Sequence, residues 1–384
     1  MILPDYDGGS IVNLMASIEA GLGGVAQGYS PLQEPLLDDL ADTEKVLLLA
    51  IDGLGYDYLS RKGGALREHL QGSLTSVCPA TTASAVTSFL TGVAPQQHGF
   101  TGWFNWFREI GSVLAVLPFH SRFGGEPLRG VGFTPATLCG GTPLFERLQA
   151  DVHVVTPDWI ANSVFNRSFQ NGARAWPYRG LEGLFAEIEQ ALKASPGRTL
   201  IYAYWPEFDS IAHTHGIASS ETTKLFEQLD TAFARLVRRL QGSGIKLIVT
   251  ADHGFIDSPL ERTVLLEDHP VLADTLILPL CGEQRFSYCY VHPGQERRFE
   301  EYVGNELCHC AELFASTELI ERGWFGLGEP FPKLRERVGH YTLVMKENWK
   351  IKEWVLGEKR HQHIGVHGGV SREEMLVPLI VVEL

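Results

Sequence analysis

Five short apolar runs divide the chain, and their pattern predicts buried β-strands. Each run is rich in leucine or β-branched residues and does not alternate apolar with polar side chains, which is typical of strands buried on both faces of a mostly parallel sheet. The predicted fold class is therefore α/β, a mostly parallel central sheet with helices on both faces. The runs cover residues 45–52, 152–155, 199–205, 245–252 and 376–382.

The segment between the third and fourth runs has the spacing of an amphipathic helix. Apolar residues recur at helical intervals through residues 221–241, and Gly242 and Gly244 follow as a stop signal. A strand, a helix and a strand joined in this way form a right-handed βαβ unit. Such sheets carry their chemistry at the carboxyl ends of the strands.

Two long segments interrupt this alternation, namely residues 100–180 and 255–363. A chain of 384 residues is longer than one compact core usually holds. We therefore expect a single catalytic domain over residues 1–384 with an inserted cap at residues 255–363. No internal repeat or charged linker divides the chain further.

Two aspartates stand where apolar runs end. Asp52 and Asp252 occur in the sequences IDGLG and ADHGF, and His253 follows the second directly. A carboxylate at the carboxyl end of a strand points into the substrate crevice, and a nearby glycine lets the chain turn sharply. Turns after strands also favour aspartate for local reasons, so one such residue alone is weak evidence.

Further candidate ligands follow the third run and precede the last. Asp209 and His213 are four residues apart, which places both side chains on one face of a helix. His215 competes with His213 as a ligand, but its two-residue offset turns it off that face. His367 lies among glycines in GVHGGV, where the backbone can approach an ion or simply form a tight turn.

A threonine pair precedes the predicted helix at residues 83–90. Thr81 or Thr82 therefore stands at a helix N-terminus, where backbone N–H groups and the helix dipole favour phosphate, although threonine is also a common N-cap. A nearby metal ion would activate such a hydroxyl as a nucleophile. Three Asp and three His divide into two sites that suit two divalent metal ions, Zn above all, with Mn or Fe as alternatives.

Composition narrows the possible partners. The net charge of −14 argues against nucleic-acid polymers and anionic membranes, whereas a small phosphorylated substrate remains compatible if metal ions reverse the local field. The N-terminus lacks the pattern of a secretory signal, so we expect a cytoplasmic protein. The six cysteines are scattered and predict mostly buried thiols, and the triplet at residues 308–310 lacks a second ligand pair.

Five motifs resemble the alkaline phosphatase superfamily, and within it the type I phosphodiesterase/nucleotide pyrophosphatase family. They occur in the family's order between about residues 46 and 382, and five separated motifs in one order rarely coincide. The motifs are AIDGLG, PATTASAVTSFLTGVAPQQHG, PEFDSIAHTHG, TADHG and GVHGG.

The resemblance implies a division of labour among these residues. One metal would be held by Asp209, His213 and His367, and the other by Asp52, Asp252, His253 and the nucleophilic threonine. Counting back from the TG that closes the second motif places the nucleophile at Thr82. The implied reaction is in-line attack of Thr82 on phosphorus, followed by hydrolysis of a phosphothreonine intermediate.

One position departs from the family's pattern. Well-studied nucleotide pyrophosphatases have an asparagine in the helical turn after the nucleophile, and this chain has Ala85. Phosphomonoesterase, phosphomutase and phosphonate hydrolase activity on the same scaffold therefore stay open, as does a non-catalytic ligand-binding role. A sulfatase is rejected, because Cys78 is not followed by the C-x-P-x-R spacing.

Two groups of residues are candidates for substrate selection. The aromatic residues 103–107 can stack on a base or an aryl group, but such clusters are more often core. Basic residues near the last motif can reach a second phosphate or form a solvated face. The aromatic group is Trp103, Phe104, Trp106 and Phe107, and the basic group is Lys346, Lys350, Lys352, Lys359 and Arg360.

Overall fold

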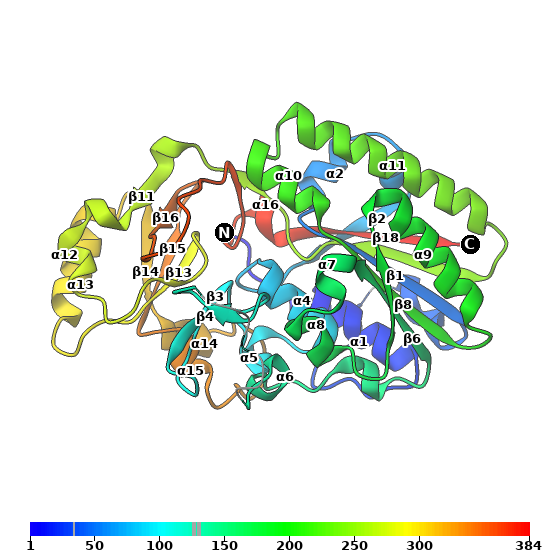
Figure 1. Cartoon of the computed structure of the whole chain (residues 1–384), viewed down its shortest axis with the longest axis horizontal. Helices are drawn as coiled ribbons and strands as arrows, with labels where there is room; N and C mark the ends of the chain where they lie inside the picture. Colours follow the sequence, from blue (N-terminus) through cyan, green and yellow to red (C-terminus); the bar gives the residue numbers. More distant parts are fainter. Residues whose placement is uncertain (34, 125–127, 129–131) are drawn as a thin grey trace.

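Two seven-stranded sheets lie side by side in the computed structural model (Figure 1). The structure describes residues 1–33, 35–124, 128 and 132–384. Among these residues, no helix combines the length and the apolar character needed to cross a bilayer.

The first sheet carries the five predicted strands. Every neighbouring pair runs parallel except the two pairs made by β18, which is antiparallel to both β2 and β9. The prediction of a mostly parallel α/β sheet is therefore confirmed. In spatial order the strands are β2 (Leu70–Thr75), β18 (Leu376–Glu383), β9 (Ile245–Thr250), β1 (Lys45–Ile51), β8 (Thr199–Trp205), β6 (Asp151–Pro157) and β7 (Arg174–Tyr178).

Helices cover both faces of this sheet (Figure 1). One face carries α9 (Gly180–Ala194) and α11 (Ser220–Leu240), the crossover helix that the apolar spacing predicts. The other face carries α1 (Ile11–Gly21) and α4 (Thr82–Thr91). Six of the seven residues of β1 are buried, because the strand lies in the middle of this sandwich.

The second sheet combines strands from both long segments. Its pairs are antiparallel, and it has its own apolar cluster around Phe286, Tyr288 and Trp324. Because residues 104–121 share this sheet, the boundaries 255–363 for a cap stay a prediction. In spatial order the strands are β14 (Ala311–Ala315), β15 (Tyr341–Met345), β13 (Phe286–Cys289), β12 (Cys281–Gly282), β3 (Phe104–Phe107), β4 (Ser112–Ala115) and β5 (His120–Ser121).

Three shorter elements connect the sheets to the site. Helix α10 (Glu207–His215) follows β8, and α16 (Arg372–Met375) precedes β18. Strand β16 (Lys350–Lys352) pairs in parallel with β11 (Thr263–Leu265) beside the second sheet.

A buried ion pair joins the half of the molecule built on the first sheet to the half built on the second. Arg285 directly precedes β13 of the second sheet, and Glu374 lies in α16, next to β18 of the first. The Arg285 Nε lies 2.7 Å from Oε1 of Glu374, and its Nη2 lies 2.9 Å from Oε2. Both side chains are almost fully buried. Burial by itself raises the pKa of the Glu374 carboxyl, but the Arg285 charge and the hydrogen bonds outweigh burial and hold that pKa below its ordinary value.

Replacing Glu374 by alanine will leave the Arg285 guanidinium buried without its partner. We expect Glu374→Ala to lower the free energy of unfolding by about 3–5 kcal/mol. In the control Glu336→Ala, which breaks the exposed pair of Arg108 and Glu336, the loss should stay below about 1 kcal/mol. Urea unfolding measures both, and equal losses would contradict the structural importance of the buried pair.

The same pair predicts the direction of a pH effect. Because the pKa of Glu374 is depressed in the folded state, its contribution is present above the unfolded pKa of about 4.3 and is lost as pH falls toward the folded pKa. The stability difference between the native chain and Glu374→Gln should therefore shrink in acid.

Candidate active site

Three carboxylates meet where neighbouring parallel strands end. Strands β9, β1 and β8 are adjacent, so their carboxyl ends lie along one edge of the sheet. Asp52 directly follows β1, Asp252 stands two residues beyond β9, and Asp209 lies in the first turn of α10 after β8. The topology alone therefore gathers three negative charges in one place.

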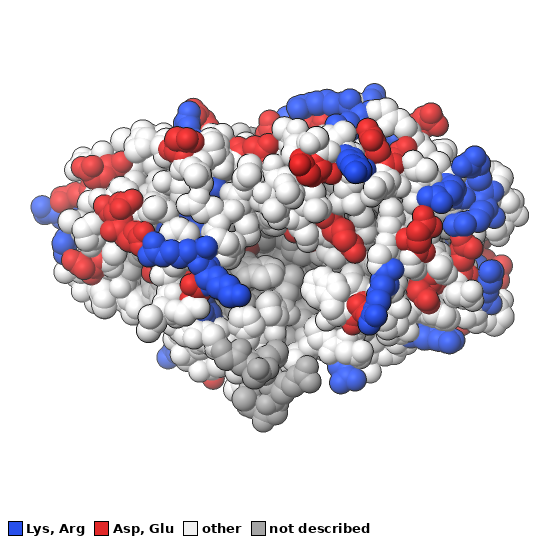
Figure 2. Space-filling model, turned by 45° about the horizontal axis from the view of Figure 1, so that its top comes forward, with Lys and Arg blue, Asp and Glu red and all other residues white. Residues whose placement is uncertain are grey.

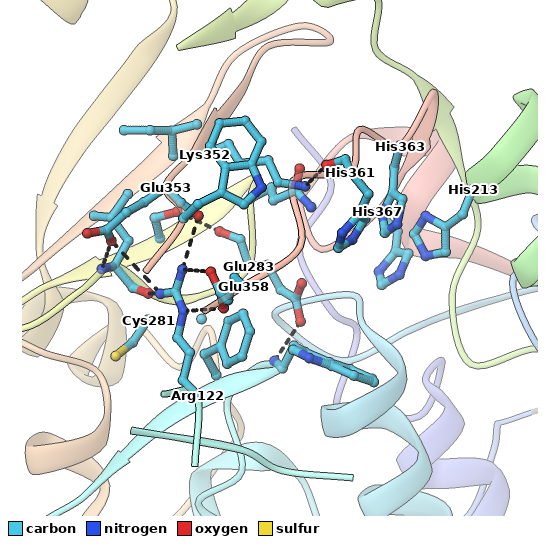
Figure 3. Close-up of a pocket in the computed structure, with 18 of the residues that line it drawn as sticks. Arg122, His213, Cys281, Glu283, Lys352, Glu353, Glu358, His361, His363 and His367 are labelled. Atoms are coloured by element: carbon cyan, nitrogen blue, oxygen red, sulfur yellow. Dashed lines mark hydrogen bonds and ion pairs between the residues drawn. The ribbon is translucent and has the colours of Figure 1, made fainter. Parts of the chain in front are cut away.

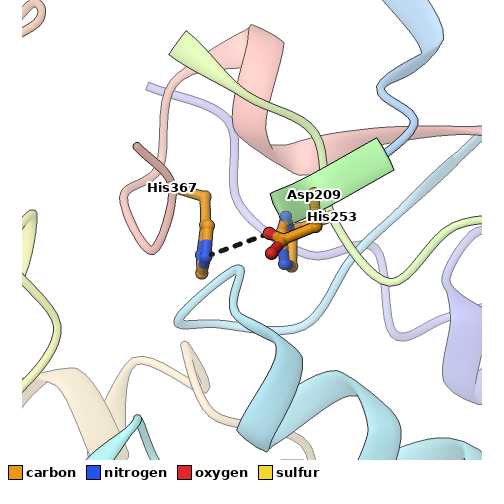
Figure 4. A group of neighbouring side chains, drawn as sticks. All are labelled: Asp209, His253 and His367. Atoms are coloured by element: carbon orange, nitrogen blue, oxygen red, sulfur yellow. Dashed lines mark ion pairs between the residues drawn. The ribbon is translucent and has the colours of Figure 1, made fainter. Parts of the chain in front are cut away.

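Histidines complete two overlapping clusters around these carboxylates. The His253 Nε2 lies 3.3 Å from Oδ1 of Asp52 and 3.4 Å from Oδ2 of Asp252. On the other side, Oδ1 of Asp209 lies 3.3 Å from Nε2 of His213. The same oxygen lies 3.8 Å from Nε2 of His367 (Figure 4). The rings of His253 and His367 stack at 3.8 Å, so the two clusters are continuous.

A backbone carbonyl orients each of these imidazoles. Because a carbonyl oxygen only accepts, Nδ1 carries a hydrogen in each ring, and Nε2 is the nitrogen left to bind a metal ion. This is the arrangement that metal-binding histidines use. The bonds join His213 to Gly365 (2.9 Å), His253 to Gly254 (3.1 Å) and His367 to Ala80 (3.3 Å).

The carboxylates are oriented in a similar way. Asp252 accepts the backbone N–H groups of Gly53 and His253, both at 3.0 Å, with Oδ1, and Asp52 accepts the Tyr204 hydroxyl with Oδ2. Gly53 has a φ of +76°, and a Cβ there would lie 2.4 Å from the Phe255 ring, which explains the glycine after Asp52.

The inward carboxylate oxygens are buried and have no hydrogen-bond donor among the described residues. They are Oδ1 of Asp52, Oδ1 of Asp209 and Oδ2 of Asp252. Buried anionic oxygens without partners are costly unless a cation compensates them. Two groups of ligand atoms lie close enough together to hold an ion: Asp209 with His253 and His367, and Asp52 with Asp252 and His253. The two groups share His253, and their carboxylate oxygens and imidazole nitrogens are donors that suit divalent ions.

The pKa values report the same concentration of charge. Burial, followed by the charges of Asp252 and Asp209, raises the pKa of Asp52 well above its ordinary value. Burial, followed by the charges of His253 and His213, lowers the pKa of His367 well below its ordinary value. A neutral imidazole is the form that binds a metal.

The two threonines of the second motif have different surroundings. Thr82 opens α4, and its Oγ1 lies 3.0 Å from Nε2 of His253, among the candidate ligands. The hydroxyl of Thr81 instead donates to Oε1 of Glu283 at 2.6 Å. Burial raises the pKa of this Glu283 carboxyl to about 7. The geometry therefore leaves the Thr82 hydroxyl directed at the centre.

A cavity of about 510 Å³ extends from this centre to the second sheet. Figure 2 shows a hollow between the two halves of the molecule, and Figure 3 shows the histidines on one side of the cavity and Arg122, Glu353 and Glu358 on the other. Of the predicted aromatic group, Trp103 and Phe104 line the cavity, whereas Phe107 belongs to the core.

Several cavity residues carry no sequence signal. Glu283, Arg122 and His363 line the wall but lie in no recognisable motif, and only the folded chain brings them to the centre. Ala85 is fully buried in α4. Among the described residues, the cysteines near His309 belong to no candidate metal cluster, and Cys308 is exposed while Cys310 is buried.

The fold is that of the alkaline phosphatase superfamily. Within it, the chain belongs to the type I phosphodiesterase / nucleotide pyrophosphatase family, whose sequence profile matches residues 46–369.

Named relatives extend this comparison. Ectonucleotide pyrophosphatase/phosphodiesterase family member 1 of Rattus norvegicus is 25% identical over 246 residues, which are 59% of this chain and 26% of the rat protein. The mouse protein of the same name is 24% identical over the same shares. The chain thus spans about a quarter of the length of these curated relatives.

Solved structures share the fold. Human ectonucleotide pyrophosphatase / phosphodiesterase 5 has a TM-score of 0.67 at 18% identity, covering 88% of this chain and 87% of that one. Phosphonoacetate hydrolase from Sinorhizobium meliloti, in complex with phosphonoformate, has a TM-score of 0.61 at 19% identity, covering 88% of this chain and 89% of that one.

The two histidines of α10 provide a matched test of the centre. His213 faces Asp209, whereas His215 is exposed. We expect His213→Ala to lower the metal content of the purified protein and His215→Ala to leave it unchanged, because only His213 reaches the centre. Elemental analysis after dialysis measures the bound metal, and an equal loss in both variants would refute the placement.

Proposed function

We propose that this chain is a two-metal-dependent hydrolase of phosphate esters, of the phosphodiesterase or nucleotide pyrophosphatase type, with Thr82 as its nucleophile. The observation that carries the proposal is the Thr82 hydroxyl at the N-terminus of α4, 3.0 Å from His253 and beside the buried carboxylates. The family membership supports the same class of reaction.

The ligand sets follow the two sides of the centre. One ion would be held by Asp209, His213 and His367. The other would be held by a second set of four residues that includes Asp52. Zinc suits these nitrogen and oxygen donors, with manganese or iron as alternatives. When bound, the ions supply positive charge that favours the Thr82 alkoxide and offsets charge on the reacting phosphate. The second set is Asp52, Thr82, Asp252 and His253.

The chain's own residues then account for the transfer. Oγ1 of Thr82 forms a bond to phosphorus while the bond from phosphorus to the leaving oxygen breaks, and that oxygen takes up a proton. Water subsequently attacks the phosphothreonine, the bond from phosphorus to Oγ1 of Thr82 breaks, and a proton from the water restores the Thr82 hydroxyl. The N-terminus of α4 favours the phosphate through its backbone N–H groups and dipole.

A second candidate is phosphonate hydrolysis on the same centre. Ala85 offers no side-chain amide where well-studied diesterases have an asparagine, so diester specificity is the least supported part of the proposal. One solved structure with this fold is in complex with AMP and another is in complex with phosphonoacetate, and both ligands are small phosphorus compounds. Product analysis separates the candidates, because a phosphonate hydrolase breaks a carbon–phosphorus bond and a mutase releases little free phosphate.

The neighbouring threonines test the nucleophile. We expect Thr82→Ala to lower kcat on an aryl phosphodiester by about three orders of magnitude or more, because the substitution removes the hydroxyl that lies 3.0 Å from His253 among the candidate ligands. Thr81→Ala should lose far less, since its hydroxyl is occupied by Glu283. Steady-state assays with metal, with and without a chelator, measure both variants.

The opposite ranking would transfer the role to Thr81. Activity that survives in Thr82→Ala at the parental level would exclude Thr82 from the chemistry. If neither aryl phosphodiesters nor aryl phosphomonoesters are hydrolysed by the metal-loaded chain, the proposed hydrolase function is wrong.

A further inference from the structure

Thr81 has the position of a helix N-cap, but its side chain caps no N–H group. It directly precedes α4, and its backbone is extended, with φ −143° and ψ 150°. A threonine in this place ordinarily accepts a hydrogen bond from the second or third N–H of the helix. Thr81 makes no such bond. In the described part of the chain, every other serine or threonine that caps an α-helix does accept one, namely Ser10, Thr134, Ser163, Ser219 and Ser371.

Glu283 explains why Thr81 differs from these residues. Its Oε1 accepts the Thr81 hydroxyl at 2.6 Å and the backbone N–H of Trp103 at 2.7 Å (Figure 3). A hydrogen bond to a carboxylate is stronger than one between neutral groups such as a backbone N–H and a hydroxyl. The direction of the Thr81 side chain is therefore set by Glu283 and not by the helix.

The Glu283 side chain is itself held in place by the fold. It lies in the turn between β12 and β13, where its backbone N–H donates to the carbonyl of Phe286 at 2.9 Å. On its other side it packs against the loop of His367. Gly368 in that loop has a φ of +100°, and a Cβ there would lie 2.6 Å from Cβ of Glu283. The carboxylate is thus fixed between the loop of the candidate nucleophile and the loop of a candidate ligand.

Two N–H groups at the start of α4 are left open by this arrangement. The N–H groups of Thr82 and Ala83 have no hydrogen-bond acceptor among the described residues, whereas the next two bond to the carbonyl of Thr81. At the same helix end, Oγ1 of Thr82 lies 3.0 Å from Nε2 of His253, beside the buried carboxylate oxygens that have no partner. Open N–H groups next to a nucleophile can donate to the oxygens of a phosphoryl group.

From these contacts we infer that Glu283 is a positioning residue that keeps Thr81 from capping α4 and so leaves the N–H groups of Thr82 and Ala83 free for the reacting phosphoryl group. Without this acceptor, the Thr81 hydroxyl turns to the helix and occupies an N–H group that the phosphate needs. The inference rests on the proposed function, because it takes the phosphorus group to lie beside Thr82.

A double substitution separates this role from a merely structural one. Glu283→Met keeps the bulk that packs against Gly368 but removes the acceptor. We expect it to lower kcat on an aryl phosphodiester about tenfold, the effect of losing one hydrogen bond to a charged group. The loss requires the Thr81 hydroxyl, so in a Thr81→Ala background the same substitution should cost less than about threefold. In a Thr81→Ser background, which keeps a hydroxyl, the loss of about tenfold should return.

Two single substitutions serve as controls. Glu283→Gln retains an amide oxygen that accepts the Thr81 hydroxyl, so its kcat should stay within about threefold of the native value. Thr81→Ala leaves both N–H groups open and should also cost less than about threefold. The second control tests the inference even if no Glu283 variant folds. Urea unfolding shows which variants are folded, and Glu283→Ala replaces Glu283→Met if the latter is not.

Binding of orthovanadate gives a readout that needs no turnover. Titration calorimetry of the metal-loaded chain should show an affinity that is about tenfold weaker in Glu283→Met, because one N–H donor to the vanadate oxygens is occupied. The affinity should recover when Thr81→Ala is added. A change that only loosened the structure would not be reversed by removing a second side chain.

Two results would overturn the inference. A tenfold loss in Glu283→Met that persists in the Thr81→Ala background means that Glu283 does not act through the Thr81 hydroxyl. A kcat of Thr81→Ala as low as that of Glu283→Met means that the Thr81 hydroxyl is itself required. Failure of the proposed hydrolase is a separate result, since it would appear as absent turnover by the native chain with the ranking of vanadate affinities intact.

Discussion

The concentration of three buried carboxylates at one sheet edge is the constraint on which the rest of the site depends. Because strands β9, β1 and β8 are parallel neighbours, the backbone holds the carboxylates of Asp52, Asp209 and Asp252 close together. Their inward oxygens have no donors among the described residues, and mutual repulsion raises the pKa of Asp52 beyond the effect of burial. A fold that accepts this arrangement is suited to holding cations.

The surrounding contacts hold the candidate ligands in place at that sheet edge. Backbone carbonyls from separate loops orient His213, His253 and His367. The Tyr204 hydroxyl donates a hydrogen bond to Oδ2 of Asp52. The loop with His367 is itself fixed, because Glu374 accepts the N–H of Gly369 at 2.8 Å while pairing with Arg285. The same buried ion pair therefore fixes the loop that carries His367 and attaches the second sheet to the first.

The two sheets contribute different chemistry to the cavity. The first sheet supplies the candidate metal ligands and Thr82, whereas the second sheet and β16 supply walls that carry Glu283, Arg122 and Lys352. Cationic groups on that wall coexist with an overall charge of −14, because burial and the pairing of nearby carboxylates with Arg122 decide the local field.

The sequence by itself determined five of the seven strands of the first sheet and its crossover helix, and it supplied the candidate ligands, whereas β2 and β7 were not predicted. Strands buried on both faces read as continuous apolar runs, and the ligands stand directly after those runs or in short motifs, so local patterns are sufficient there. The second sheet was not predicted from the sequence, because its strands are only two to five residues long. In addition, β3 pairs with β12, which lies in a distant segment of the chain.

Only the tertiary structure decided which of two like residues faces the centre. Only the family resemblance favours Thr82 over Thr81 in the sequence, and the difference in their contacts comes from Glu283, which accepts the Thr81 hydroxyl. In the same way, Lys352 differs from Lys346 only through what surrounds each ammonium. A local pattern records periodicity, whereas the partner of a side chain depends on long-range packing that no short stretch of sequence contains.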